Sequence, residues 1–232
     1  MSLFDFILPR FCLTCGRRLI SSEQHLCAHC LLSLPRVDLY PSVEDNRMVR
    51  RYWGKVDVCK GASVLYYVPE DYVSHIVKAF KYGGNKRIAV FMGRVMAQEL
   101  MSSHFFDDID CIVPVPISLL RTLGRGYNQC HHLARGIGSV TGIPYETRLL
   151  KKKCGASSQT RKSHQERIDN AVGAYRLTDD NSLIQRYAHK HLLLLDDVVT
   201  TGSTTLSCTK ELKKIPGVQV SILSLALTKT RD

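Results

Sequence analysis

The chain has 232 residues, of which 44% are hydrophobic, and it carries a formal net charge of +11. This length suits one α/β domain with a small additional unit. No apolar run reaches the ~20 residues that a membrane-spanning helix needs, so we expect a cytoplasmic protein with no membrane span. The positive charge predicts an anionic partner, either a phosphorylated metabolite or a nucleic acid.

Four of the nine cysteines form two C-x-x-C pairs near the N-terminus: Cys12, Cys15, Cys27 and Cys30. In a reducing compartment such pairs favour metal over disulfides. Four thiolates make the closed tetrahedral site of a structural zinc ion. Because about forty residues cannot build an adequate core alone, the metal would supply folding energy. Free buried thiols or a redox pair are the competing interpretations, and His25 and His29 are alternative ligands.

The chain divides by pattern into two parts. We expect residues 1–60 to form a zinc-ribbon-like module and a linker, and residues 61–232 to form the second domain. Within the linker, Pro35, Pro41 and the charged run at residues 44–51 argue against a long helix. Trp53 is the sole tryptophan, and we expect it to pack the linker onto the second domain.

From residue 62 onward, strand and helix patterns alternate. Apolar residues at three- and four-residue spacing predict helices, and short apolar runs predict strands. The expected strands are residues 62–68, 109–113, 192–195 and 218–227, and the expected helices are residues 72–82, 88–100, 129–140 and 206–214. This alternation predicts an α/β fold with a parallel sheet flanked by helices.

The stretch HLLLLDDVVTTGSTT at residues 191–205 combines a buried strand with an anion-binding loop. Residues 192–195 are apolar on both faces, as in a central parallel strand. Asp196 and Asp197 follow, where we expect the strand to leave the core. Hydroxyls, a close backbone approach and free helix N–H groups would then come from Thr200, Thr201, Gly202, Ser203 and Thr204. The glycine patterns of a Rossmann site and of a P-loop are missing.

This stretch resembles the signature that binds 5-phosphoribosyl 1-diphosphate (PRPP) in type I phosphoribosyltransferases. Three further motifs accompany it: KYGG at residues 81–84, VPVP at residues 113–116 and RGYNQ at residues 125–129. Together with the cysteine pairs, they resemble the ComF/GntX family, the competence-protein-F group. The resemblance implies a type I phosphoribosyltransferase-like domain with an N-terminal zinc ribbon. It also implies a role in natural transformation, which is the uptake and handling of single-stranded DNA.

The resemblance assigns ligand contacts as well. Asp196 and Asp197 would hold the ribose hydroxyls of PRPP, and residues 200–204 would hold its 5′-phosphate, with Mg²⁺ bridging the diphosphate. A basic region at residues 148–167 would be a flexible loop over PRPP, a contact for a nucleic-acid backbone, or simply solvated. The candidates for the diphosphate or this loop are Arg121, Arg125, Arg161, Lys162 and Arg167.

Two functions stay open from the sequence. One is a phosphoribosyltransferase or PRPP-binding protein that acts in DNA uptake. The other is a non-catalytic module that binds single-stranded DNA or adapts DNA-uptake proteins on the same scaffold. No residue identifies the group that would attack C1′ of PRPP, so the acceptor substrate has no candidate.

Overall fold

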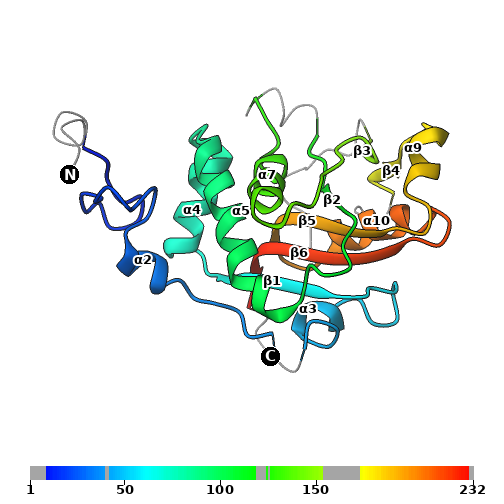
Figure 1. The fold of residues 1–232 in the computed structure, drawn as a ribbon, viewed down its shortest axis with the longest axis horizontal. Coiled ribbons are helices and arrows are strands. Elements are labelled where there is room, and N and C mark those ends of the chain that lie inside the picture. The colour runs from blue at the N-terminus through cyan, green and yellow to red at the C-terminus, as the bar shows by residue number, and fades with distance from the viewer. Residues whose placement is uncertain (1–8, 40–41, 119–123, 125, 154–172, 230–232) are drawn as a thin grey trace.

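The structure is a computed structural model, and it describes residues 9–39, 42–118, 124, 126–153 and 173–229 (Figure 1). Its centre is a four-stranded sheet in the order β1-β6-β5-β2. All three pairings in this sheet are parallel. The strands are β1 (Gly61–Tyr67), β2 (Cys111–Pro114), β5 (His191–Val199) and β6 (Gln219–Thr228). The predicted parallel α/β sheet is therefore confirmed.

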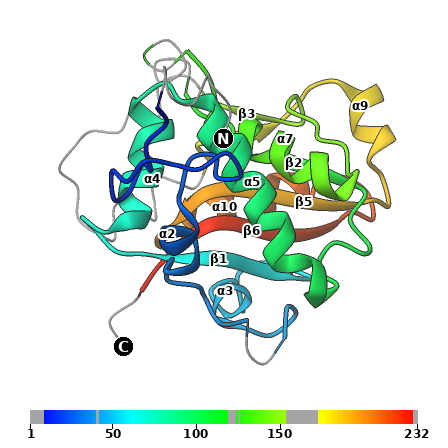
Figure 2. The ribbon, with the colours of Figure 1, turned by 60° about the vertical axis from the view of Figure 1, so that its left-hand side comes forward.

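Helices cover both faces of this sheet (Figures 1 and 2). The helices α4 (Tyr72–Tyr82), α5 (Lys86–Leu100) and α7 (Gln129–Thr141) lie on one face, and α3 (Arg47–Arg50) and α10 (Ser203–Leu212) lie on the other. Leu193 and Leu195 pack in the core cluster of the first face, while Leu192 and Leu194 pack in that of the second. Since side chains alternate along a strand, the unbroken leucine run of β5 fills two cores.

Two glycines let α5 and α7 approach closely. A Cβ atom at Gly93 would lie 2.2 Å from the carbonyl oxygen of Leu133, and one at Gly136 would lie 2.2 Å from that of Val90. Any larger residue would force the helices apart, since real Cβ atoms do not come so near a backbone oxygen. This contact fixes the middle of α7 against α5.

Smaller elements complete the described residues. A two-stranded antiparallel sheet pairs β3 (Leu150–Lys152) with β4 (Tyr175–Leu177). The remaining helices are α2 (Ala28–Leu32), the short 3₁₀ helix η1 (Met101–Ser103) and α9 (Asn181–Arg186). No helix in the described ranges combines the length and the apolar character that a membrane crossing requires.

The cysteine module, which is residues 9–39, lies beside α4 and α5 (Figure 2). Leu19, Leu26 and Leu34 join the core cluster of that face. The His25 ring meets the Phe91 ring of α5 edge to face at 5.5 Å. Arg36 donates two hydrogen bonds to Oε1 of Glu99, at 3.0 and 2.6 Å. The module thus shares a core with the helices of the sheet.

Two sequence-based expectations are wrong in detail. The acidic pair does not follow the strand but lies inside β5, where Asp196 is paired with Ser224 of β6. The strand continues because β6 keeps pairing with it as far as Val199. Trp53 does not pack the linker onto the sheet, since it is 59% exposed. Its neighbour Tyr52 is the buried aromatic residue at this point.

Candidate functional site

The two carboxylates of β5 are buried. Asp196 is 8% exposed and Asp197 is 4% exposed. Strands β6 and β2 pair on either side of β5, so its backbone holds the acids near the carboxyl end of a central strand. In open α/β sheets this is the edge at which ligands bind.

Asp197 is held by two side chains from distant parts of the sequence. The Nζ atom of Lys81 lies 2.9 Å from Oδ2 of Asp197. The side-chain amide of Gln129 donates to the same oxygen at 2.7 Å. Lys81 opens the KYGG motif at the end of α4, and Gln129 closes the RGYNQ motif at the start of α7. The sequence had placed these motifs together without giving either residue a role.

The third motif joins the same cluster through backbone contacts. Asn128 donates from Nδ2 to the carbonyl of Val115, in VPVP, at 2.9 Å. Its Oδ1 caps α7 by accepting from the Cys130 N–H at 3.0 Å. The hydroxyl of Tyr127 donates to the carbonyl of Phe80, next to Lys81. KYGG and RGYNQ therefore meet at Asp197, and VPVP is joined to RGYNQ through Asn128.

Asp196 has a different environment from its neighbour. Burial raises the pKa of Asp196 to about 7, and the Asp197 charge adds to the shift while Lys81 opposes it. Its Oδ1 accepts from the Asp197 N–H at 2.8 Å and lies 3.9 Å from the Cys130 thiol. Burial alone would lower the pKa of Lys81, but the Asp197 carboxylate outweighs it and raises that pKa. One acid is thus in an ion pair, while burial and the neighbouring charge favour the protonated form of the other.

The TTGSTT segment, which is residues 200–205, runs from the end of β5 into α10. Gly202 has φ of +81°, a conformation that favours glycine. The hydroxyl of Thr201 lies 3.1 Å from that of Ser203. Among the α-helices of the described residues, α10 is the one that begins without a side-chain cap. The Ser203 N–H donates to the Thr201 hydroxyl at 3.4 Å, so the N–H groups of Thr204 and Thr205 are the ones suited to an anion.

Five basic residues were predicted for diphosphate or loop contacts. Arg121, Arg125, Arg161, Lys162 and Arg167 all lie outside the described residues. Of the basic region, residues 148–153 are described. The Nζ atom of Lys151 lies 3.7 Å from Oδ2 of Asp179. The Nζ atom of Lys152 lies 5.4 Å from the centre of the Tyr175 ring.

The cysteine module brings its four predicted ligands together. The sulfur atoms of Cys12, Cys15, Cys27 and Cys30 all lie within 4.8 Å of one another. Burial opposes ionisation of Cys12, but backbone N–H groups, among them that of Cys27 at 3.3 Å, lower its pKa to about 6. Four sulfur donors at this spacing fit a tetrahedral metal ion. His25 and His29 do not belong to the cluster.

Glu23 stabilises this module. The sequence pattern did not indicate a role for this residue. Its carboxylate accepts from the N–H groups of Ala28 at 2.8 Å and Ile20 at 3.0 Å, and from Arg17 at 2.8 Å. The two backbone donors are the main reason that the pKa of Glu23 is lowered. The carboxylate thereby fixes the turn between the two cysteine pairs.

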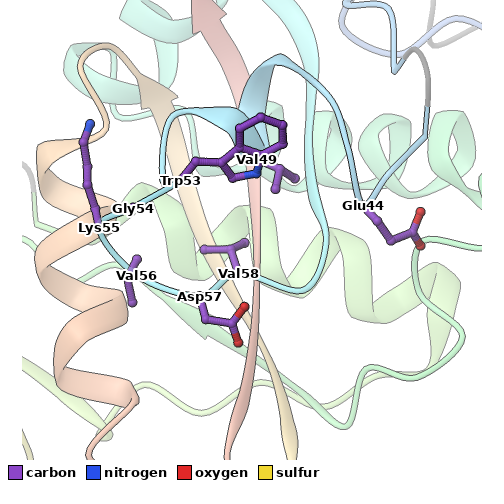
Figure 3. A pocket seen from close by; sticks show the side chains of 8 residues that line it. All are labelled: Glu44, Val49, Trp53, Gly54, Lys55, Val56, Asp57 and Val58. Carbon is purple, nitrogen blue, oxygen red and sulfur yellow. The ribbon is translucent and has the colours of Figure 1, made fainter.

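A pocket of about 410 Å³ lies away from these residues, between α3 and the segment that leads into β1 (Figure 3). It is lined by Glu44, Val49, Trp53, Gly54, Lys55, Val56, Asp57 and Val58. No residue predicted for PRPP or metal binding lines it. The pocket has no part in the site formed by the acids and the TTGSTT segment.

No protein-family model matches the chain. Competence protein F of Haemophilus influenzae is 24% identical over 219 residues, which cover 93% of this chain and 84% of the relative. DNA utilization protein YhgH of Salmonella typhimurium is 25% identical over 236 residues, covering 95% of this chain and 98% of the relative. The chain is a homologue of these proteins. The resemblance expected from the motifs is confirmed.

The solved structures that match include an adenine phosphoribosyltransferase and a PRPP amidotransferase, both with TM-scores below 0.5. An adenine phosphoribosyltransferase is 12% identical, with a TM-score of 0.39 and coverage of 66% of this chain and 75% of that chain. The glutamine PRPP amidotransferase of B. subtilis is 20% identical, with a TM-score of 0.37 and coverage of 58% of this chain and 25% of that chain.

Proposed function

We propose that this homologue of competence protein F binds PRPP, or a related phosphoribosyl ligand, and acts in DNA uptake. The observation that carries the first part is the buried acid pair, which leads directly into a helix start without a side-chain cap. Asp196 and Asp197 would accept hydrogen bonds from the ribose hydroxyls. The N–H groups and hydroxyls of residues 200–204 would bind the 5′-phosphate.

The contacts of Asp197 leave room for this role. Lys81 and Gln129 both bind Oδ2, so the ion pair does not consume Oδ1. Mg²⁺ would accompany the diphosphate of PRPP, for which the described residues offer no dedicated ligand set. The four cysteines would hold a structural Zn²⁺. The chain's residues would position the ribose and exclude water around C1′.

The role in DNA uptake extends the names of the relatives to this chain. Those names, competence protein F and DNA utilization protein, both concern DNA or competence. The net charge of +11 agrees with a polyanionic partner. Single-stranded DNA and DNA-uptake proteins are therefore the partners we propose.

PRPP with Mg²⁺ should raise the melting temperature of the protein, and Asp196→Asn should abolish that rise. A hundredfold excess over Kd stabilises a folded protein by about 2.7 kcal/mol, or roughly 5–10 °C for a chain of this size. Asp196→Asn keeps the Lys81–Asp197 ion pair, so the variant should stay folded. Differential scanning fluorimetry measures the rise in melting temperature in the wild-type protein and in the variant. Asp179→Asn is the matched control, because the Asp179 side chain is exposed. A full ligand response in Asp196→Asn would contradict the assigned role.

The alternative function, a module that binds single-stranded DNA, is favoured by the relatives' names and by the basic region. If five of its cations contact phosphates, log Kd should change with log[salt] at a slope of about 3.5 in magnitude, about 0.7 per contact. Replacing Lys151, Lys152, Lys153, Arg161 and Lys162 by Gln should flatten that slope. A fluorescence-anisotropy titration at several salt concentrations measures it.

The matched control for this experiment removes five cations elsewhere, on helices: Lys78, Arg87, Arg94, Arg135 and Lys210. It lowers the net charge equally and should leave the slope nearly unchanged. If the two sets of substitutions have the same effect, the attraction is general and the basic region is no DNA contact. If the first set instead abolishes PRPP binding, the region serves the phosphoribosyl site.

A further inference from the structure

Two neighbouring side chains of the linker contact the TTGSTT segment from outside. Arg51 donates from Nη1 to the carbonyl of Thr200 at 2.7 Å and from Nη2 to the carbonyl of Thr228 at 3.1 Å. The Tyr52 hydroxyl lies 2.6 Å from the hydroxyl of Thr205, and Tyr52 is 1% exposed. The linker thereby reaches both ends of the segment.

The direction of the Tyr52 hydrogen bond follows from the proton count. Thr205 donates its own hydroxyl hydrogen to the carbonyl of Gly202 at 3.0 Å. Since a hydroxyl has one proton, Tyr52 must be the donor to Thr205. Burial raises the pKa of Tyr52, which keeps that proton in place. The result is a relay from Tyr52 through Thr205 to Gly202, the residue with positive φ.

The same tyrosine also limits the space around Gly202. A Cβ atom at Gly202 would lie 3.3 Å from the Tyr52 hydroxyl oxygen. The carbonyl of Thr200 is meanwhile held by Arg51 and lies 3.4 Å from the Thr228 hydroxyl. Donors thus engage the carbonyls of Thr200 and Gly202, and these contacts restrain the backbone of the segment.

The part of the linker that carries Arg51 and Tyr52 is itself held in place by hydrogen bonds of Asn46. Asn46 is 2% exposed and caps α3 by accepting from the N–H groups of Met48 and Val49, at 2.8 and 3.3 Å. Its Nδ2 donates to the carbonyls of Ser42 and Gly61, at 2.7 and 2.8 Å. Since Gly61 begins β1, the short helix that ends just before Arg51 is fixed to the edge of the sheet.

We propose that Arg51 and Tyr52 are positioning residues that hold the TTGSTT segment in the conformation that binds the 5′-phosphate. This inference rests on the proposed phosphoribosyl site. A loop already in its binding conformation loses less entropy when it binds. The guanidinium of Arg51 also brings a positive charge beside the segment, which favours an anion there. The linker is then part of the ligand site, although it lies outside the signature motif.

Tyr52→Phe and Arg51→Met test this with neighbouring residues as controls. Trp53→Phe and Arg50→Met are the matched controls, because Trp53 is exposed and Arg50 pairs with Asp45 at 2.7 Å. We expect PRPP with Mg²⁺ to bind each test variant about tenfold more weakly, the equivalent of one lost hydrogen bond to a charged or buried group. Isothermal titration calorimetry measures the affinities. Arg51→Lys, which keeps the charge, should recover part of the loss.

Amide hydrogen exchange separates positioning from a general loss of stability. In the two test variants, exchange should become faster in peptides that cover residues 199–206 and stay unchanged in β1, α5 and α7. Affinities within twofold of the controls, or faster exchange spread over the whole chain, would overturn the inference. A wild-type protein that binds no PRPP would end the proposed function instead. The exchange pattern would in that case still decide whether the two side chains hold the segment.

Discussion

Asp197→Asn should destabilise the protein by up to about 3–5 kcal/mol, because the buried Lys81 ammonium loses its ion-pair partner and keeps near it only Asp196, whose ionisation burial opposes. The side chain of Lys81 is 20% exposed, and that of Asp197 is 6% exposed. Water can therefore replace little of the stabilisation that the Asp197 carboxylate gives to the Lys81 ammonium. Asp196→Asn should instead stabilise the protein at neutral pH, since it removes a buried carboxyl that resists ionisation. Adjacent residues of one strand, changed in the same way, should shift stability in opposite directions.

The Asp196 effect should depend on pH with a defined sign. Its pKa is about 7 in the folded protein, above the value of about 3.9 in an unfolded chain. Between about pH 4 and about pH 7, the folded state holds a proton that the unfolded state has lost. Stability therefore falls as pH rises through this window, by at most about 1.4 kcal/mol per pH unit, and levels off above it. Asp196→Asn should remove this contribution from the slope.

Urea unfolding of both variants at about pH 5 and about pH 8 checks these expectations. The matched control is Asp45→Asn, since Asp45 pairs with Arg50 and both side chains are well exposed. An exposed pair contributes at most about 1 kcal/mol. Lys81→Met added to Asp197→Asn should recover part of the loss, because the uncompensated charge is then gone. If Asp197→Asn costs no more than the control, the ion pair does not hold the site together.

The order of strands and helices around these acids could be predicted from the sequence, because each element carries its own period of apolar residues. The residue at which β5 ends could not be predicted from the sequence. The leucine run stops at Leu195, and two charges usually mark a surface. Here Lys81 neutralises one of them, and β6 continues to pair as far as Val199. A contact between residues so far apart in the chain leaves no local pattern.

The residues that surround the site also make contacts between distant parts of the chain, which leave no local sequence pattern. KYGG and RGYNQ were recognisable as motifs, yet only the packing of α4 and α7 brings Lys81 and Gln129 to one oxygen of Asp197. Tyr52 and Trp53 are adjacent aromatics in a polar linker, so composition favours neither as the buried one. Asn46 caps α3 and donates to the carbonyl of Gly61 at the start of β1, and the local sequence does not reveal this second contact. The cysteine cluster was predictable because its ligands are close in sequence and chemically distinct.

Loss of the metal should have the largest effect on the cysteine module. We expect one Zn²⁺ per chain in freshly purified protein, and we expect Cys27→Ser to lose it. Cys27 is buried, its sulfur lies 3.8 Å from that of Cys15, and it caps α2 by accepting from the Cys30 N–H at 3.4 Å. Structural zinc in small modules contributes about 10–16 kcal/mol of apparent binding energy at pH 7. Without it, residues 9–39 should lose their fold.

Elemental analysis and limited proteolysis measure the two outcomes, with Cys59→Ser as the control, because Cys59 does not belong to the cluster. Cleavage should begin in the module and spare the sheet, since the described core of β5 and β6 contains no metal ligand. Glu23→Gln should weaken zinc binding without abolishing it, because the turn at Ile20 and Ala28 loses a charged acceptor while all four sulfurs remain. A Cys27→Ser protein that keeps stoichiometric zinc would contradict the site. Protein that lacks metal and still resists proteolysis would show instead that the shared packing of Leu19, Leu26 and Leu34 with α4 and α5 is sufficient to fold the module.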